Sequence, residues 1–280
     1  MLSVARKNPM NPMIQPALPV RPRATATTSR HPAFSVPAKH NPRLQALVER
    51  IDADEELRQL WRCANVNAGE RCGLGDHGET HARIVANAGL RLLRILLEAG
   101  HRSGVVDGHN LARADAEVVV VLAAALHDIG LSVSVADPGG AGLLLAHAKA
   151  AQLLDGLYHP AERTALSAEI LHALHAHHQK SASLTLEASV LTTADVLDLS
   201  KGRVGAAEGE TDDVESVHIT RGVSRPVRVE IHLGDSGSLP VVTRRLSGRL
   251  EILPVAQALE FVVHQASSPT RHFVLQHSIT

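Results

Sequence analysis

The chain contains an uninterrupted apolar run, Val118-Val-Val-Val-Leu-Ala-Ala-Ala-Leu126, which leads directly into His127-Asp128-Ile129-Gly130. Nine apolar residues in a row predict a helix that is buried in the protein core. An imidazole and a carboxylate follow at the end of this helix, and both bind divalent metals in proteins. The sequence therefore predicts a core helix whose end presents His127 and Asp128 to a metal ion.

The composition predicts a mainly helical protein. Hydrophobic residues make up 44% of the 280 residues but aromatic residues only 2%, so leucine, valine, isoleucine and alanine must fill the core. This mixture favours helices and argues against an antiparallel sandwich. The net charge of −1 gives no strong signal for nucleic acid. No segment approaches 18 apolar residues, so we expect a cytoplasmic protein without a membrane span, whose two cysteines are reduced.

The chain divides into four segments. Residues 1–42 hold eight of the fourteen prolines and no acidic residue, which predicts a disordered tail. Residues 43–204 have helical periodicity, with helices expected from Arg43 and over 55–65, 77–99, 114–129, 142–157, 160–178 and 187–200. An acidic linker follows at 205–213. Residues 214–280 alternate like strands around a short helix at 239–250, which predicts a small α+β domain, and we expect it to form a homodimer.

Further histidines and carboxylates lie on other predicted helices. His77 and His81 are four residues apart, so their side chains share one helix face. Asp195 lies near the end of the predicted bundle, and a bundle can bring such residues together in its interior. The candidate histidines between His127 and Asp195 are His147, His172, His177 and His178, whereas His101, His109, His159 and His175 are expected to be surface residues. A set without thiolates suits Mn, Fe, Ni, Zn or Mg rather than a structural cysteine–zinc site.

Two short motifs in the same region match known signatures only in part. His-Gly-Glu-Thr-His at 77–81 lacks the glutamate that a zinc protease carries directly after its first histidine. Gly73-Leu-Gly-Asp-His-Gly78 matches a dinucleotide-binding pattern, but no strand is predicted before it. Neither motif therefore predicts a function.

The order His81…His127-Asp128…Asp195 resembles the HD superfamily of metal-dependent phosphohydrolases. The flanking residues carry the same resemblance: His81-Ala-Arg-Ile-Val, Ala-Leu-His-Asp-Ile-Gly and Thr-Ala-Asp195-Val-Leu-Asp198. Further stretches are similar to archaeal HD proteins that carry a C-terminal α+β domain: Ala64-Asn65 with Asp76-His-Gly-Glu-Thr-His81, Glu169-Ile-Leu-His172-Ala-Leu…His177, and Asp198-Leu-Ser-Lys-Gly-Arg203. The resemblance covers about residues 45–265 and implies an HD-type helical bundle followed by a small α+β domain.

The resemblance also implies a set of metal ligands. His81, His127, Asp128 and Asp195 would hold a first divalent ion, and Asp128 can bridge to a second. The candidates for the second ion are His177, His172 and His147, in that order. Residues 132–140 lack the histidines that the archaeal members have there, so a second site would depend on these later residues.

The activity implied is hydrolysis of a phosphomonoester or phosphodiester, with a nucleotide as the expected substrate. Lys201, Arg203 and Arg83 are the expected phosphate-binding cations, since negative charge develops on oxygen in the transition state. A neutral His77 or His147 is expected to protonate the leaving oxygen, with Asp128 in the catalytic centre. Two alternatives stay open: a diiron oxygenase with the same ligands, and a non-catalytic, dimeric nucleotide-binding regulator.

Overall fold

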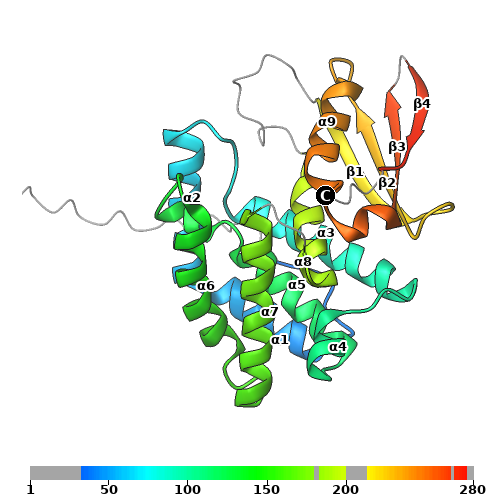
Figure 1. Cartoon of the computed structure of the whole chain (residues 1–280). Helices are drawn as coiled ribbons and strands as arrows, with labels where there is room; N and C mark the ends of the chain where they lie inside the picture. Colours follow the sequence, from blue (N-terminus) through cyan, green and yellow to red (C-terminus); the bar gives the residue numbers. More distant parts are fainter. Residues whose placement is uncertain (1–32, 180–182, 200–212, 266–267, 276–280) are drawn as a thin grey trace, which may run out of the picture. The chain divides into compact units, whose positions relative to one another are not determined.

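The computed structural model describes residues 33–179, 183–199, 213–265 and 268–275. From Phe34 onward the chain belongs to one compact unit. It is mostly helical, with a small four-stranded sheet near its C-terminus (Figure 1). This confirms the predicted mainly helical class with a small α+β part. Most of the predicted tail and residues 205–212 of the predicted linker lie outside the described residues.

Ordered structure begins earlier than the predicted boundary at residue 43. Phe34 is 1% exposed and stacks on Trp61, with ring centroids 5.7 Å apart. Asn41 is also buried, and its side chain accepts a hydrogen bond from the backbone N–H of Leu44 at the start of the first helix. The Pro-rich composition hid this short anchor because only a few of its residues are apolar.

Eight α-helices form the helical part among the described residues, and seven of them match predicted segments. They are α1 Pro42–Ala53, α2 Glu55–Asn65, α3 Glu79–Glu98, α4 Gly104–His109, α5 Arg113–Leu126, α6 Pro138–Leu154, α7 Pro160–Gln179 and α8 Leu186–Val196. The helix that the sequence did not predict is α4, whose six residues are too few to show a period. Among the described residues, no helix is both long and apolar enough to cross a membrane.

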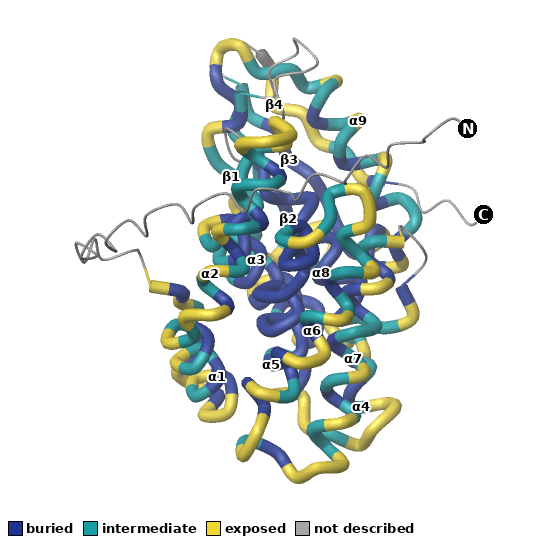
Figure 2. Tube along the Cα trace, turned by 90° about the vertical axis from the view of Figure 1, so that its left-hand side faces the viewer, coloured by how far each residue is buried: buried dark blue, intermediate teal, exposed yellow. Residues whose placement is uncertain are grey.

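The apolar run forms the centre of the core. Every residue from Val118 to Leu126 on α5 is at most 1% exposed. The helix packs against α3, α7 and α8, and the buried residues of these elements run through the middle of the molecule in Figure 2. Gly89 on α3 permits a close approach, since a Cβ there would lie 2.9 Å from Val120. Burial of each large aliphatic side chain contributes roughly 1.5–3 kcal/mol.

The helix ends just before the His-Asp pair, and a tight turn follows. His127 is the C-cap of α5, and a short 3-10 turn, η2, covers Ile129–Ser132. A Cβ on Gly130 would collide with the carbonyl oxygen of Pro138, so only glycine fits where the start of α6 approaches. The start of α6 lies before the predicted residue 142 because the Asp137 side chain caps it by accepting from Gly140 N–H.

The sheet contains β1 Val214–Arg221, β2 Val227–Leu233, β3 Leu259–Gln265 and β4 Ser268–Phe273, in that spatial order. The central pair β2–β3 is parallel and the outer pairs are antiparallel. The crossover between β2 and β3 contains α9, Leu239–Leu250. Since α9 packs against α8, and α3 packs against β1 and β2, one hydrophobic core includes both helices and sheet.

Candidate metal centre

Four side chains from three helix ends converge inside the helical part. His81 lies in the first turn of α3, His127 and Asp128 follow α5, and Asp195 lies in the last turn of α8. Their relative exposures are 1%, 1%, 8% and 7%, respectively. Three overlapping groups of potential ligands meet here: His77, His81 and Asp128; His81, His127 and Asp195; and His127, Asp128 and His177. These buried residues could hold a metal ion.

The potential ligand atoms are very close together. Nε2 of His81 lies 3.0 Å from Nε2 of His127 and 3.2 Å from Oδ1 of Asp195. Oδ2 of Asp128 lies 3.4 Å from Nε2 of His81 and 3.2 Å from Nε2 of His127. The two nitrogens and two oxygens therefore surround one small volume.

The other nitrogen of each ring fixes its tautomer. Nδ1 of His81 lies 2.6 Å from Oδ2 of Asp198, and Nδ1 of His127 lies 2.8 Å from the carbonyl oxygen of Ala124. A carbonyl or carboxylate oxygen only accepts, so both Nδ1 atoms donate a hydrogen. In the neutral imidazoles each Nε2 therefore carries a lone pair, and the two lone pairs face each other.

This arrangement fits a divalent metal. Two lone pairs 3.0 Å apart repel each other unless a metal ion or a proton lies between them. Metal–nitrogen bonds of about 2.1 Å at a right angle would separate the two nitrogens by about 3.0 Å. Two nearby carboxylates supply negative charge, and the described part of the cluster has no sulfur ligand. The donor set thus fits a borderline first-row metal.

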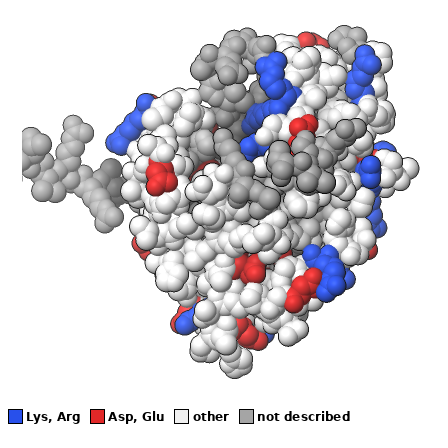
Figure 3. Space-filling view, viewed as in Figure 1, with Lys and Arg blue, Asp and Glu red and all other residues white. Residues whose placement is uncertain are grey.

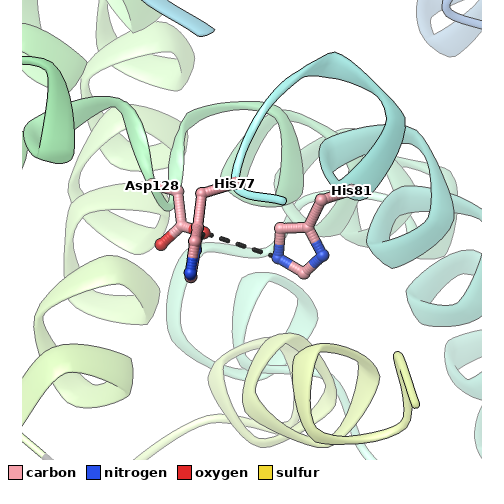
Figure 4. A group of neighbouring side chains, drawn as sticks. All are labelled: His77, His81 and Asp128. Carbon is pink, nitrogen blue, oxygen red and sulfur yellow. Dashed lines mark hydrogen bonds and ion pairs between the residues drawn. The ribbon is translucent and has the colours of Figure 1, made fainter. Parts of the chain in front are cut away.

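Asp128 is held as a carboxylate. Burial alone would raise the pKa of its carboxyl group, but the positive charge that His127 and His81 carry when protonated, and hydrogen bonds from His127 and His77, lower that pKa well below its usual value. Figure 4 shows Asp128 beside both His77 and His81, and the His77 Nδ1 lies 2.8 Å from its Oδ2. A negative Asp128 can therefore serve both as a metal ligand and as a partner for His77.

The segment that carries His77 is fixed by α2 and by the turn after Asp128. Asn65 Oδ1 accepts from the backbone N–H of His77. Asn67, in the π-helical turn η1 (Val66–Arg71), donates to the carbonyl oxygens of Leu131 and Ser132. Such π-turns occur often at functional sites, where they redirect the backbone. Here the turn holds His77 next to Asp128.

Asp198 is a site residue that sequence reasoning did not assign. It follows α8 and holds the His81 ring through the 2.6 Å hydrogen bond. Asp195 and Asp198 thus place two carboxylates at the C-terminal end of one helix, where the helix dipole disfavours negative charge. A cation in the cluster would offset this cost. The available signal was the spacing Asp195-Val-Leu-Asp198, which places both residues at one helix end.

His177 also faces the cluster from α7. Its ring is 5% exposed, and Nε2 lies 3.9 Å from Oδ2 of Asp195. Burial lowers the pKa of His177 to about 3, which keeps the ring neutral at neutral pH. Its neighbour His178 uses Nε2 to donate to the carbonyl oxygen of His127, and burial lowers its pKa as well.

Three of the other expected residues lie away from the cluster. His147 is exposed on α6. His172 is half-buried on α7 and, five residues before His177, points about 140° away from it around the helix axis. Arg83 shares its side of α3 with Asn87, which donates to Ser35, whereas His81 points roughly to the opposite side. Lys201 and Arg203 lie outside the described residues.

Comparison with known proteins gives one relative and no activity. No family model matches the chain, and no solved structure does. The chain is 29% identical over 207 residues to a protein of Methanocaldococcus jannaschii that is described as uncharacterized. The match covers 69% of this chain and 78% of the relative, so the similarity includes most of both proteins.

Proposed function

We propose that this chain is an HD-type, metal-dependent phosphohydrolase that acts on a phosphomonoester or phosphodiester, with a nucleotide as the substrate class. The observation that carries the proposal is the 3.0 Å approach of the His81 and His127 Nε2 atoms. In neutral rings their tautomers direct two lone pairs at one another, and a metal ion bound by both rings would relieve this repulsion. The order of ligands along the chain supports the HD assignment.

The chemistry that a divalent ion supplies at such a site is Lewis acidity toward a phosphoryl oxygen and a water molecule. We propose His81, His127, Asp128 and Asp195 as its ligands. Because half of these ligands are nitrogens, the set favours Mn, Fe, Ni or Zn over Mg, which prefers oxygen. Asp198 and the Ala124 carbonyl oxygen orient the two imidazoles.

His77 is proposed to carry the proton to the leaving group. Its side chain is 17% exposed, more than those of the proposed ligands, so a substrate can reach it. Asp128 accepts from its Nδ1 and fixes the ring. Imidazole suits this role because it can both hold and release a proton near neutral pH.

One observation favours a second candidate, the diiron oxygenase. The ligand groups His77–His81–Asp128 and His127–Asp128–His177 share Asp128. A shared carboxylate is what a two-metal centre requires. Such a centre would give about two irons per chain and an absorbance change on exposure to oxygen.

Metal analysis followed by a substrate panel tests the proposal. Elemental analysis of the purified protein gives the metal and its number per chain. Metal-free protein is then reloaded with Mn, Fe, Ni or Zn and assayed with nitrophenyl phosphate, bis-nitrophenyl phosphate, nucleoside phosphates and cyclic nucleotides. We expect turnover that the Asp128→Asn variant lacks. Stoichiometric metal without turnover of any substrate would overturn the assignment.

A further inference from the structure

The C-terminal α+β part reaches the metal centre through α9. Nη2 of Arg249 donates to Nδ1 of His177 at 3.3 Å and to the carbonyl oxygen of the same residue at 3.2 Å. Four residues earlier on the same helix face, Arg245 donates to the carbonyl oxygen of Asp198. One helix of the α+β part thus contacts two residues of the cluster.

The Arg249 contact determines which His177 nitrogen carries the hydrogen. A guanidinium group only donates, so Nδ1 of His177 must accept. The hydrogen of the neutral ring then lies on Nε2, the atom that faces Asp195 at 3.9 Å. His81 and His127 have the opposite arrangement, since their Nδ1 atoms donate. Two buried imidazoles therefore present lone pairs to the cluster, and the third presents an N–H group.

Arg249 also has one donor that no described residue accepts. Its Nε atom is buried and forms no hydrogen bond with the described residues. A buried N–H group of a cation is costly to leave unpaired, which favours an anionic oxygen beside it. Figure 3 shows Lys and Arg side chains grouped where α9 lies in Figure 1. The positive charge expected of a phosphate site is thus present on α9.

We propose that Arg249 is a positioning residue of the metal centre, which holds His177 as a hydrogen-bond donor toward a substrate oxygen instead of a metal ligand. This rests on the proposed phosphohydrolase function. The α+β part then completes the site and is not an independent module.

Measurements of metal binding and of the His177 tautomer test this proposal without an activity assay. In the zinc-loaded protein with ¹⁵N-labelled histidine, we expect His177 as the Nε2–H tautomer, assigned by its absence in His177→Gln. We also expect His177→Gln to bind the first metal with unchanged stoichiometry and affinity. A His177 that carries its hydrogen on Nδ1, or metal lost in His177→Gln, would overturn the proposal. These results do not depend on finding a substrate.

Activity measurements then test the role of Arg249. Once a substrate is known, Arg249→Gln and Arg249→Ala should keep the metal but lower kcat by at least about tenfold, with a smaller change in KM. Arg249→Lys should keep part of the activity, and millimolar guanidinium should partly rescue Arg249→Ala. Arg225→Ala removes an exposed arginine of the same α+β part and serves as the charge-matched control. Full activity in folded Arg249→Ala would contradict the proposal.

Discussion

Oδ2 of Asp198 accepts a hydrogen bond from Nδ1 of His81 at 2.6 Å across 117 positions of the sequence. The bond joins the end of α8 to the first turn of α3, and both residues are almost fully buried. It fixes the His81 tautomer and aims its Nε2 at His127. The geometry of the whole cluster therefore depends on a residue that binds no metal itself in our assignment.

Removal of this bond should weaken the metal site. We expect Asp198→Ala to lower metal affinity about 10- to 100-fold, the usual effect of removing a partner behind a ligating histidine. Asp198→Asn keeps an oxygen that can accept the hydrogen bond but removes the negative charge, and it should lose less metal affinity. Comparison of the two variants separates the effect of the hydrogen bond from the effect of the charge. Competition with a chromogenic chelator measures the affinity. Asp235→Asn, on an exposed turn, is the control, and equal affinities in all variants would contradict this role.

The free energy of unfolding of the metal-free protein should fall in acid. Burial lowers the pKa of His177 from 6.5 to about 3, so below pH 6.5 the unfolded chain takes up a proton that the folded chain does not. Stability is therefore lost as pH falls from about 6.5 toward 3, by at most about 1.4 kcal/mol per pH unit for this group. His178 adds in the same direction. Denaturant titrations at several pH values give the free energy of unfolding at each pH. This free energy should change less with pH in His177→Gln than in the wild type.

Sequence reasoning located the helices well where local signals are strong. The apolar run Val118–Leu126 predicts a helix in the core, and every residue of the run is buried in the structure. The segments α2 and α9 have the predicted bounds, since the Asp54 side chain caps α2 and Pro240 lies in the first turn of α9. The ligand candidates on α3, α5 and α8 meet because each lies at a helix end that faces the interior.

The positions of the residues that the sequence did not predict correctly depend on tertiary contacts, which no local sequence pattern shows. Helix α6 is apolar on nearly all sides, so its sequence does not reveal that Lys149 is buried between Asp54 and Glu56 while Leu144 is 79% exposed. His147 was therefore a candidate ligand, although the structure exposes it. Arg249 lies in a part of the chain expected to fold separately, so its contact with His177 had no sequence signal.

Gly130→Ala should destabilise the fold and disturb the site. A methyl group there would collide with the Pro138 carbonyl oxygen and the Gly142 backbone, which flexible side chains cannot relieve. We expect a loss of roughly 1–3 kcal/mol, the range for overpacking a dense interior. Gly108→Ala is the matched control, because a Cβ at that position would have no neighbour within 4 Å and alanine favours a helix. Urea titration measures both, and equal stabilities would show that the start of α6 moves freely.

Metal removal should lower the thermal unfolding midpoint. Without a metal ion or a proton between them, the His81 and His127 lone pairs repel each other, and Asp195 and Asp198 leave negative charge at the end of α8. A metal at about 100 times its dissociation constant stabilises the native state by about 2.7 kcal/mol. Chelation should reverse this, and zinc or manganese should restore it. Asp195→Asn weakens the site, so chelator should lower the thermal unfolding midpoint of this variant less. A wild-type midpoint that does not change after proven metal removal would show that the ion does not bind at this cluster.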